Sequence, residues 1–142
     1  MTRTSSLLVA LLATAPLFAH IARAQGSARA AGHIVVVKMV DRGGSAPYAF
    51  EPGKVFVQPG DTLRFLEDAG VVHNVRFKDH PSAARLGAAG TGPYLTTKGQ
   101  TYDLVIDGRF AAGSYTFVCE PHEALGMRGM LTVGTSGSSG TP

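Results

Sequence analysis

Short β-forming segments separated by turn residues make up most of this chain between residues 34 and 133. Each is rich in Val, Ile, Phe, Tyr or Thr and ends at Gly, Pro or Asp, and the whole chain contains 18 Gly and 8 Pro. Helical periodicity is almost absent. The pattern predicts an all-β, antiparallel sandwich of seven to eight strands. The expected strands are Ile34–Val40, Tyr48–Phe50, Lys54–Gln58, Thr62–Leu66, Val71–Phe77, Thr101–Ile106, Ser114–Cys119 and Gly129–Val133.

One segment between the strands is rich in Ala and Gly, from Asp79 to Gly92, and we expect at most a short helix around Ser82–Leu86 there. The chain has no Trp, so its core must consist of the Val, Leu, Ile and Phe residues of the strands. We expect Met39 in this core. Met130 is expected there too, with an apolar rim near the last loop as its alternative position.

The first 24 residues have the features of a secretory signal peptide. Arg3 supplies the positive charge, Leu7–Ala19 is an apolar run, and Ala22–Ala24 gives the small-x-small pattern of a cleavage site. The run is shorter than the roughly 20 residues that a membrane span needs, and a retained anchor is the alternative. We therefore expect an exported protein, periplasmic or extracytoplasmic. Its predicted segments are a signal peptide (1–24), a flexible lead-in (25–32), one folded domain (33–134) and a flexible Gly/Ser/Thr tail (135–142).

Charge and hydropathy exclude some partners. The chain has 13 Lys and Arg against 10 Asp and Glu, and two of the basic residues, Arg3 and Arg23, lie in the leader. The remaining basic residues are scattered, without the cluster or basic helix of a nucleic-acid interface. No later stretch is apolar enough to cross a bilayer. We therefore expect neither a nucleic-acid partner nor a membrane span after cleavage of the signal peptide.

Four side chains have the chemistry of a metal site: Cys119, His122 and Met127 in one loop, and His73 upstream. Thiolate and thioether favour Cu(I) while imidazole accepts Cu(I) or Cu(II), so the set suits one copper ion that changes oxidation state. Cys119 is the only cysteine, which excludes an internal disulfide. An exported thiol would normally be oxidised unless it is buried or bound to a metal, so a buried, inert cysteine is the alternative.

Local sequence explains how the loop could bring its ligands together. Cys119 ends a predicted strand, Pro121 turns the chain, and Gly126 permits a tight return. The other segment carries His73 and Asn74; a core histidine is the alternative there, and the Asn74 amide could bond the backbone beside Cys119 and support the ligands. The remaining histidines of the predicted domain, at positions 33 and 80, are expected on the surface.

The motif Cys119-x-x-His122-x4-Met127, with an upstream His73-Asn74, resembles the small blue copper proteins of the plastocyanin, pseudoazurin and amicyanin group. The likeness covers residues 34–133 and includes Phe50-Glu51-Pro52, Gln58-Pro59-Gly60-Asp61-Thr62 and Gly113-Ser114-Tyr115-Thr116-Phe117. It implies a cupredoxin-like Greek-key β-sandwich. It also implies a type 1 site in which His73, Cys119 and His122 form a plane around copper and Met127 is a weak axial ligand.

These observations favour a soluble one-electron carrier that cycles between Cu(I) and Cu(II). We expect a monomer that docks transiently with redox proteins through an apolar collar of Pro121, Ala124 and Leu125. The alternative is a periplasmic copper carrier or sensor with the same ligands but no electron-transfer role. A structural zinc site is a less favoured alternative, because closed zinc sites seldom include Met. An enzyme is not expected, because the chain has no His-x-His pairs for further copper centres and no second cysteine for a binuclear one.

Overall fold

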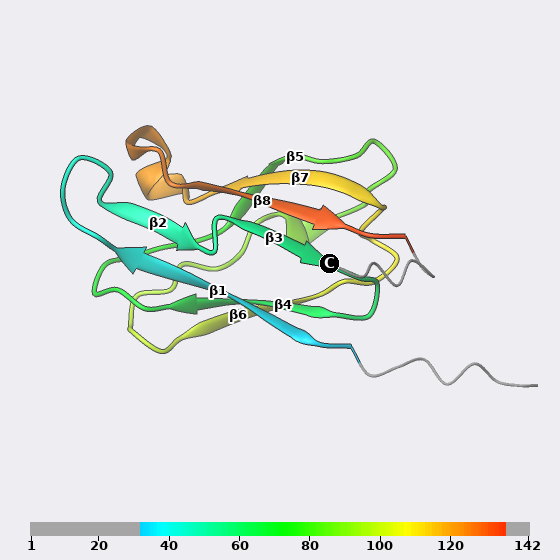
Figure 1. Ribbon diagram of the computed structural model, residues 1–142, viewed down its shortest axis with the longest axis horizontal. Helices are drawn as coiled ribbons and strands as arrows, with labels where there is room; N and C mark the ends of the chain where they lie inside the picture. Colours follow the sequence, from blue (N-terminus) through cyan, green and yellow to red (C-terminus); the bar gives the residue numbers. More distant parts are fainter. Residues whose placement is uncertain (1–31, 136–142) are drawn as a thin grey trace, which may run out of the picture.

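Eight β-strands form two four-stranded sheets that pack face to face in the computed structural model, which describes residues 32–135 (Figure 1). The first sheet has the strand order β2-β1-β4-β6 and the second has the order β3-β8-β7-β5. The predicted signal peptide, most of the lead-in and the end of the tail lie outside the described residues. The strands are β1 (Ile34–Asp41), β2 (Tyr48–Glu51), β3 (Lys54–Val57), β4 (Thr62–Glu67), β5 (Arg76–Asp79), β6 (Thr101–Val105), β7 (Gly113–Val118) and β8 (Arg128–Val133).

The all-β sandwich of eight strands is confirmed, but the expectation of purely antiparallel pairing was wrong. β1 pairs in parallel with β4, from Ile34 opposite Thr62 to Met39 opposite Glu67. β3 pairs in parallel with β8, and the other pairings are antiparallel. Side-chain alternation shows which face of a strand is buried, but it does not show which strand lies beside it or in which direction.

One predicted strand is much shorter in the structure. Val71–Phe77 was expected to be a strand, yet only Arg76–Asp79 is one, as β5. His73 instead forms an isolated bridge with Leu95, and the amide of Gly92 donates to the carbonyl of Val75. The alternation of this segment persists because it still has a buried face, but its hydrogen-bond partner is an irregular segment instead of a sheet.

Two short 3-10 helices complete the described chain, η1 (Gly87–Gly90) and η2 (Glu120–Leu125). Ser82–Leu86, where at most a short helix was expected, forms no helix; a turn closed by the Ala84 amide and the Pro81 carbonyl occupies that place, and η1 follows it. η2 lies at one end of the sandwich, at the left in Figure 1. Across residues 32–135, no helix has the length and apolar character that a membrane crossing requires.

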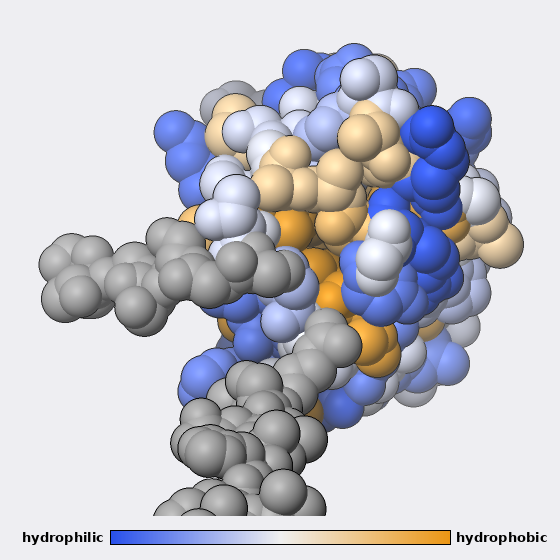
Figure 2. All heavy atoms as spheres, turned by 90° about the vertical axis from the view of Figure 1, so that its right-hand side faces the viewer, coloured by the Kyte–Doolittle hydropathy of each residue, from blue (hydrophilic) through white to orange (hydrophobic). Residues whose placement is uncertain are grey.

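Alternating side chains from both sheets fill the space between them. Phe65, Phe117 and Leu131 are fully buried, and so is Met39, as expected. Met130 was expected in the core but is 41% exposed, because β8 turns Gly129 and Leu131 inward and Met130 between them outward. Figure 2 views the end of the sandwich opposite η2, where apolar side chains lie between polar ones.

We predict that Gly129→Ala destabilises the fold, because a Cβ at this position would overlap the ring of Phe117. Overpacking of this kind costs roughly 1–3 kcal/mol. Urea unfolding of the metal-free protein measures the change. Gly108→Ala is the matched control, because nothing lies within 4 Å of the added methyl group there. An unchanged midpoint for Gly129→Ala would contradict the inward packing of β8.

Candidate metal centre

Three of the predicted ligands lie on a loop that closes on itself between β7 and β8. Cys119 directly follows β7, His122 lies within η2, and Met127 directly precedes β8. The Cys119 amide donates to the Met127 carbonyl over 3.2 Å, and the Met127 amide donates to the His122 carbonyl over 3.2 Å. Gly126 supplies the left-handed turn that ends η2, with φ of 85°. The backbone therefore fixes the relative positions of all three residues.

His73 lies in a different segment of the chain, and its side chain lies beside those of Cys119 and His122. Its amide donates to the Leu95 carbonyl over 3.0 Å, and the Leu95 amide donates back to the His73 carbonyl over 2.8 Å. Its side chain is fully buried, as is that of Cys119. This exchange of backbone bonds fixes where the His73 side chain starts, although the residue is outside any named strand.

The side chains of His73, Cys119 and His122 converge on one point. Cys119 Sγ lies 3.5 Å from Nδ1 of His73 and 3.4 Å from Nδ1 of His122, and the two nitrogens are 3.2 Å apart. A point equidistant from these atoms lies about 1.9 Å from each, within a few tenths of an ångström of the roughly 2.0–2.3 Å at which imidazole and thiolate bind a metal. The three donors therefore fit one ion. Within residues 32–135 they form a cluster whose ligand atoms all lie within 4.8 Å of one another.

Met127 lies beside this cluster in the chain and is fully buried. Its backbone bonds to Cys119 and to His122, so the residue is fixed next to the other two loop residues. It contributes a fourth candidate donor, of the soft type that favours Cu(I).

Asn74 joins the two ligand segments. Its Oδ1 accepts from the Glu120 amide over 2.8 Å, and its Nδ2 donates to Glu120 Oε2 over 2.7 Å. The predicted bond to the backbone beside Cys119 is therefore present. Arg76 donates to the other Glu120 oxygen over 2.6 Å, which orients the carboxylate for Asn74.

Tyr48 contacts both histidine rings, a feature the sequence analysis missed. Its ring lies 3.8 Å from that of His122, centroid to centroid, with an interplanar angle of 31°. It also meets His73 edge-on at 5.6 Å. Tyr48 shares the inward face of β2 with Phe50, which was the available signal, but alternation alone could not identify His122 as the neighbour. The tyrosine limits the movement of the His122 ring.

Burial keeps the candidate ligands uncharged in the metal-free protein. It lowers the pKa of His73 to about 4, with the nearby His122 adding to the effect, and it also lowers the pKa of His122. Burial raises the pKa of the Cys119 thiol. Both imidazoles are therefore neutral at neutral pH, the form that binds metals, whereas the thiol must lose a proton on binding.

Glu67 is a second residue that the sequence analysis did not single out. It ends β4 on the same inward face as Leu63 and Phe65, and it is fully buried. One oxygen accepts from the Ala69 amide over 2.9 Å, while Oε2 has no hydrogen-bond partner among the described residues. Burial raises the pKa of this carboxyl group. Its charge also helps to raise the pKa of Cys119, which places it within electrostatic range of the cluster.

The loop around His122 is accessible from outside. His122 is half-buried, and Leu125 is 48% exposed. Pro121 and Ala124 are also exposed. The residues of the predicted collar therefore lie on the surface, next to the candidate ligand His122 in the chain. His33 and His80 are exposed as expected, and neither belongs to the cluster.

We predict that the metal-free protein loses stability as the pH falls from about 6.5 to about 4, partly because of His73. Its imidazole binds a proton in the unfolded chain at higher pH than in the fold, so unfolding takes up a proton in this range. The full contribution is roughly 3 kcal/mol. Urea unfolding across this pH range should show a shallower slope for His73→Gln. His80→Gln is the surface control, and an equal change in both variants would contradict the prediction.

Comparison with known proteins agrees with this geometry. The chain matches the plastocyanin/azurin family of copper-binding proteins over residues 35–134. The plastocyanin of Scenedesmus fuscus is 36% identical over 91 residues, which cover 63% of this chain and 90% of that protein. The chloroplastic plastocyanin of Hordeum vulgare is 32% identical over 117 residues, covering 81% of this chain and 74% of the relative.

Solved structures show the same architecture. Oxidised plastocyanin from Dryopteris crassirhizoma superposes with a TM-score of 0.57 at 27% identity, covering 70% of this chain and 99% of that one. Pseudoazurin from Methylobacterium extorquens AM1 gives 0.52 at 32% identity, covering 71% and 75%. The chain therefore belongs to the plastocyanin/azurin family, as a plastocyanin-like cupredoxin that has copper as its cofactor and is not an enzyme.

Proposed function

We propose that this protein is an exported one-electron carrier with a mononuclear type 1 copper site. The observation that carries the proposal is the triangle of one sulfur and two Nδ1 atoms, with sides of 3.2–3.5 Å. Copper bound there supplies a Cu(I)/Cu(II) couple, for which a mixed thiolate and imidazole site is suited.

The roles of the ligands follow from their chemistry and positions. His73, Cys119 and His122 would hold the ion, and the buried Met127 would supply the weak axial ligand that the resemblance implies. Asn74 supports the site from outside by holding Glu120, the residue next to Cys119. Because these residues are fixed by backbone bonds and packing, the site changes little between oxidation states, which keeps electron transfer fast.

A redox partner approaches at the exposed end of the loop. His122 is the candidate ligand with partial exposure, and the collar of Pro121, Ala124 and Leu125 surrounds it with small or apolar surface. Such a collar supports brief contacts, because transient redox interfaces bury little area, below about 1,200 Å². The carrier acts as a monomer at this contact.

Export to the periplasm, or to another extracytoplasmic space, follows from the predicted signal peptide. A single cysteine bound to copper is protected in an oxidising compartment, where an unbound thiol would be oxidised. The buried position of Cys119 supports this protection.

The test is the visible and electron paramagnetic resonance spectrum of the copper-loaded protein, followed by repeated oxidation and reduction. We expect intense thiolate-to-Cu(II) absorption and retention of the metal over many cycles. Cys119→Ser should abolish the colour. Met127→Leu should keep the colour and raise the reduction potential, because the axial ligand tunes the couple. A colourless Cu(II) protein would exclude the carrier role, and loss of colour in Met127→Leu would exclude the axial assignment.

We further predict that Tyr48 delays the release of His122 in acid. Protonation of a ligand histidine competes with Cu(I), so the reduction potential should rise as the pH falls. Without the stacked ring the histidine moves more easily, and Tyr48→Leu should begin this rise at a higher pH. Protein-film voltammetry between pH 4 and pH 8 measures the onset. Tyr94→Leu, which removes an exposed tyrosine, is the control; the same onset in wild type and Tyr48→Leu would refute the prediction.

A further inference from the structure

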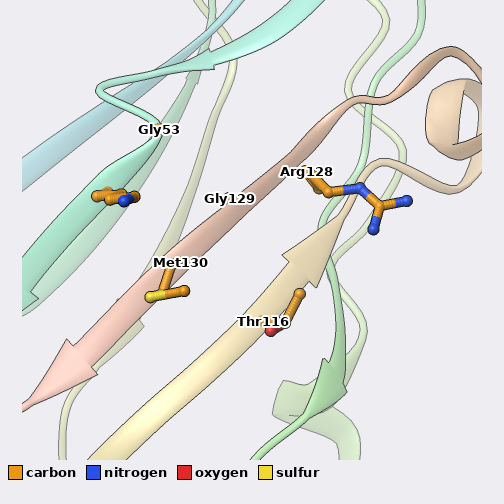
Figure 3. Close-up of a pocket in the computed structure, with 6 residues that line it drawn as sticks. Gly53, Thr116, Arg128, Gly129 and Met130 are labelled. Carbon is orange, nitrogen blue, oxygen red and sulfur yellow. The ribbon is translucent and has the colours of Figure 1, made fainter.

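A groove with a volume of about 350 Å³ lies on the outer face of the second sheet, away from the core. It spans the neighbouring strands β3, β8 and β7. Met130 pairs with Lys54 on one side and with Thr116 on the other. Figure 3 shows Met130 and Thr116 on adjacent strands, with Arg128 at the start of β8. The lining residues, here called the basic groove, are Gly53, Lys54, Thr116, Arg128, Gly129 and Met130.

The two cations of the basic groove have no carboxylate partner among residues 32–135. Other basic residues on the same sheet are paired: Arg76 with Glu120 at 2.6 Å and Lys78 with Glu123 at 3.1 Å. Lys54 and Arg128 form no such ion pair within the described part of the chain. The groove therefore presents two positive charges that no carboxylate of residues 32–135 pairs with.

Exposed apolar side chains accompany these charges. Met130 is 41% exposed inside the groove, and Phe56, the next outward residue of β3 after Lys54, is 52% exposed. Methionine is flexible and polarisable and adapts to different apolar partners. The surface thus combines two cations with an adaptable apolar contact.

The basic groove begins next to the candidate metal centre. Arg128 directly follows Met127, and Figure 3 shows its side chain extending over the end of β7 toward η2. Met130 lies three residues after Met127, roughly 10 Å along an extended strand. A segment of another protein bound in the groove would hold the rest of that protein close to the loop that carries His122.

We infer that the basic groove docks an acidic segment of the redox partner, with carboxylates at Lys54 and Arg128 and an apolar side chain against Met130. The identity of this partner rests on the proposed electron-carrier function. Charge complementarity carries the choice: an arginine fork binds carboxylates in two-point fashion. Two copies of this chain that met groove to groove would repel each other. Two cations around an apolar contact fit a protein segment better than a nucleic-acid backbone.

The test is a nuclear magnetic resonance titration of the ¹⁵N-labelled, Cu(I)-loaded protein with the capped peptide Asp-Glu-Leu-Glu-Asp. We expect shifts at the amides of Lys54, Thr116, Arg128 and Met130. Lys54→Gln and Arg128→Gln should each raise the dissociation constant roughly two- to five-fold, as loss of an exposed charge pair does. Added salt should weaken binding, and so should a peptide with Gly in place of Leu.

Arg85→Gln is the matched control. Arg85 is also an exposed cation without a carboxylate partner in residues 32–135; it bonds instead to the carbonyls of Ser82 and Ala84. Its amide donates to the carbonyl of Arg109. Arg109 lies on the loop before β7, whereas η2 follows the other end of β7, so Arg85 is away from η2. The control should bind the peptide as the wild type does. Equal weakening in all three variants, shifts confined to η2, or no binding would overturn the inference.

This experiment separates the groove from the redox site. Peptide binding is read from amide shifts, whereas the electron-carrier role is read from colour and from repeated cycling. A protein that is colourless when loaded with Cu(II), yet binds the peptide at the basic groove in the titration, would refute the electron-carrier role. The groove would then remain a site for an acidic segment. A blue, cycling protein that does not bind the peptide there would refute the groove alone.

Discussion

The two-way bond between Asn74 and Glu120 is the contact that makes one site from two distant segments. One segment carries His73 and is held by Leu95 outside any named strand; the other carries three candidate ligands on a self-closed loop. Asn74 accepts from the Glu120 backbone and donates to its side chain, so it fixes distance and orientation together. Arg76 restrains the carboxylate from the other side. Together with the pairing of Arg76 and Val118 between β5 and β7, this link holds the two segments side by side where the sulfur and the two imidazole nitrogens meet.

Burial prepares the site chemically as well as geometrically. It keeps both imidazoles neutral and the Cys119 thiol protonated. An incoming metal ion therefore meets two imidazoles that are already in the form that binds metals. The thiol must release a proton on binding, which makes uptake of the metal depend on pH. Glu67 adds to this low-dielectric region a carboxyl group whose Oε2 has no hydrogen-bond partner within residues 32–135. Groups of this kind interact with a nearby charge more strongly than the same groups at the surface.

The sequence was most informative where local spacing decides structure. Alternation located the strands, and the spacing from Cys119 to Met127 located the loop, because both are properties of short stretches. It was least informative about neighbours distant in sequence. Alternation does not show which distant segments meet. Three features depend on such meetings: the parallel strand pairs, the bridge from His73 to Leu95, and the stacking of Tyr48 on His122. The same limit applies to Met130, which is apolar but lies on the outward side of β8.

The place of β8 in the second sheet has a consequence for the order of assembly. This last strand lies between β3 and β7, so the sheet cannot close until the C-terminal part of the domain is available. Pairings between strands so far apart in the chain form slowly. A polypeptide with this topology leaves its second sheet open until β8 can pair with β3 and β7. The candidate ligands on the loop before β8 are then brought together in the same event that completes the fold.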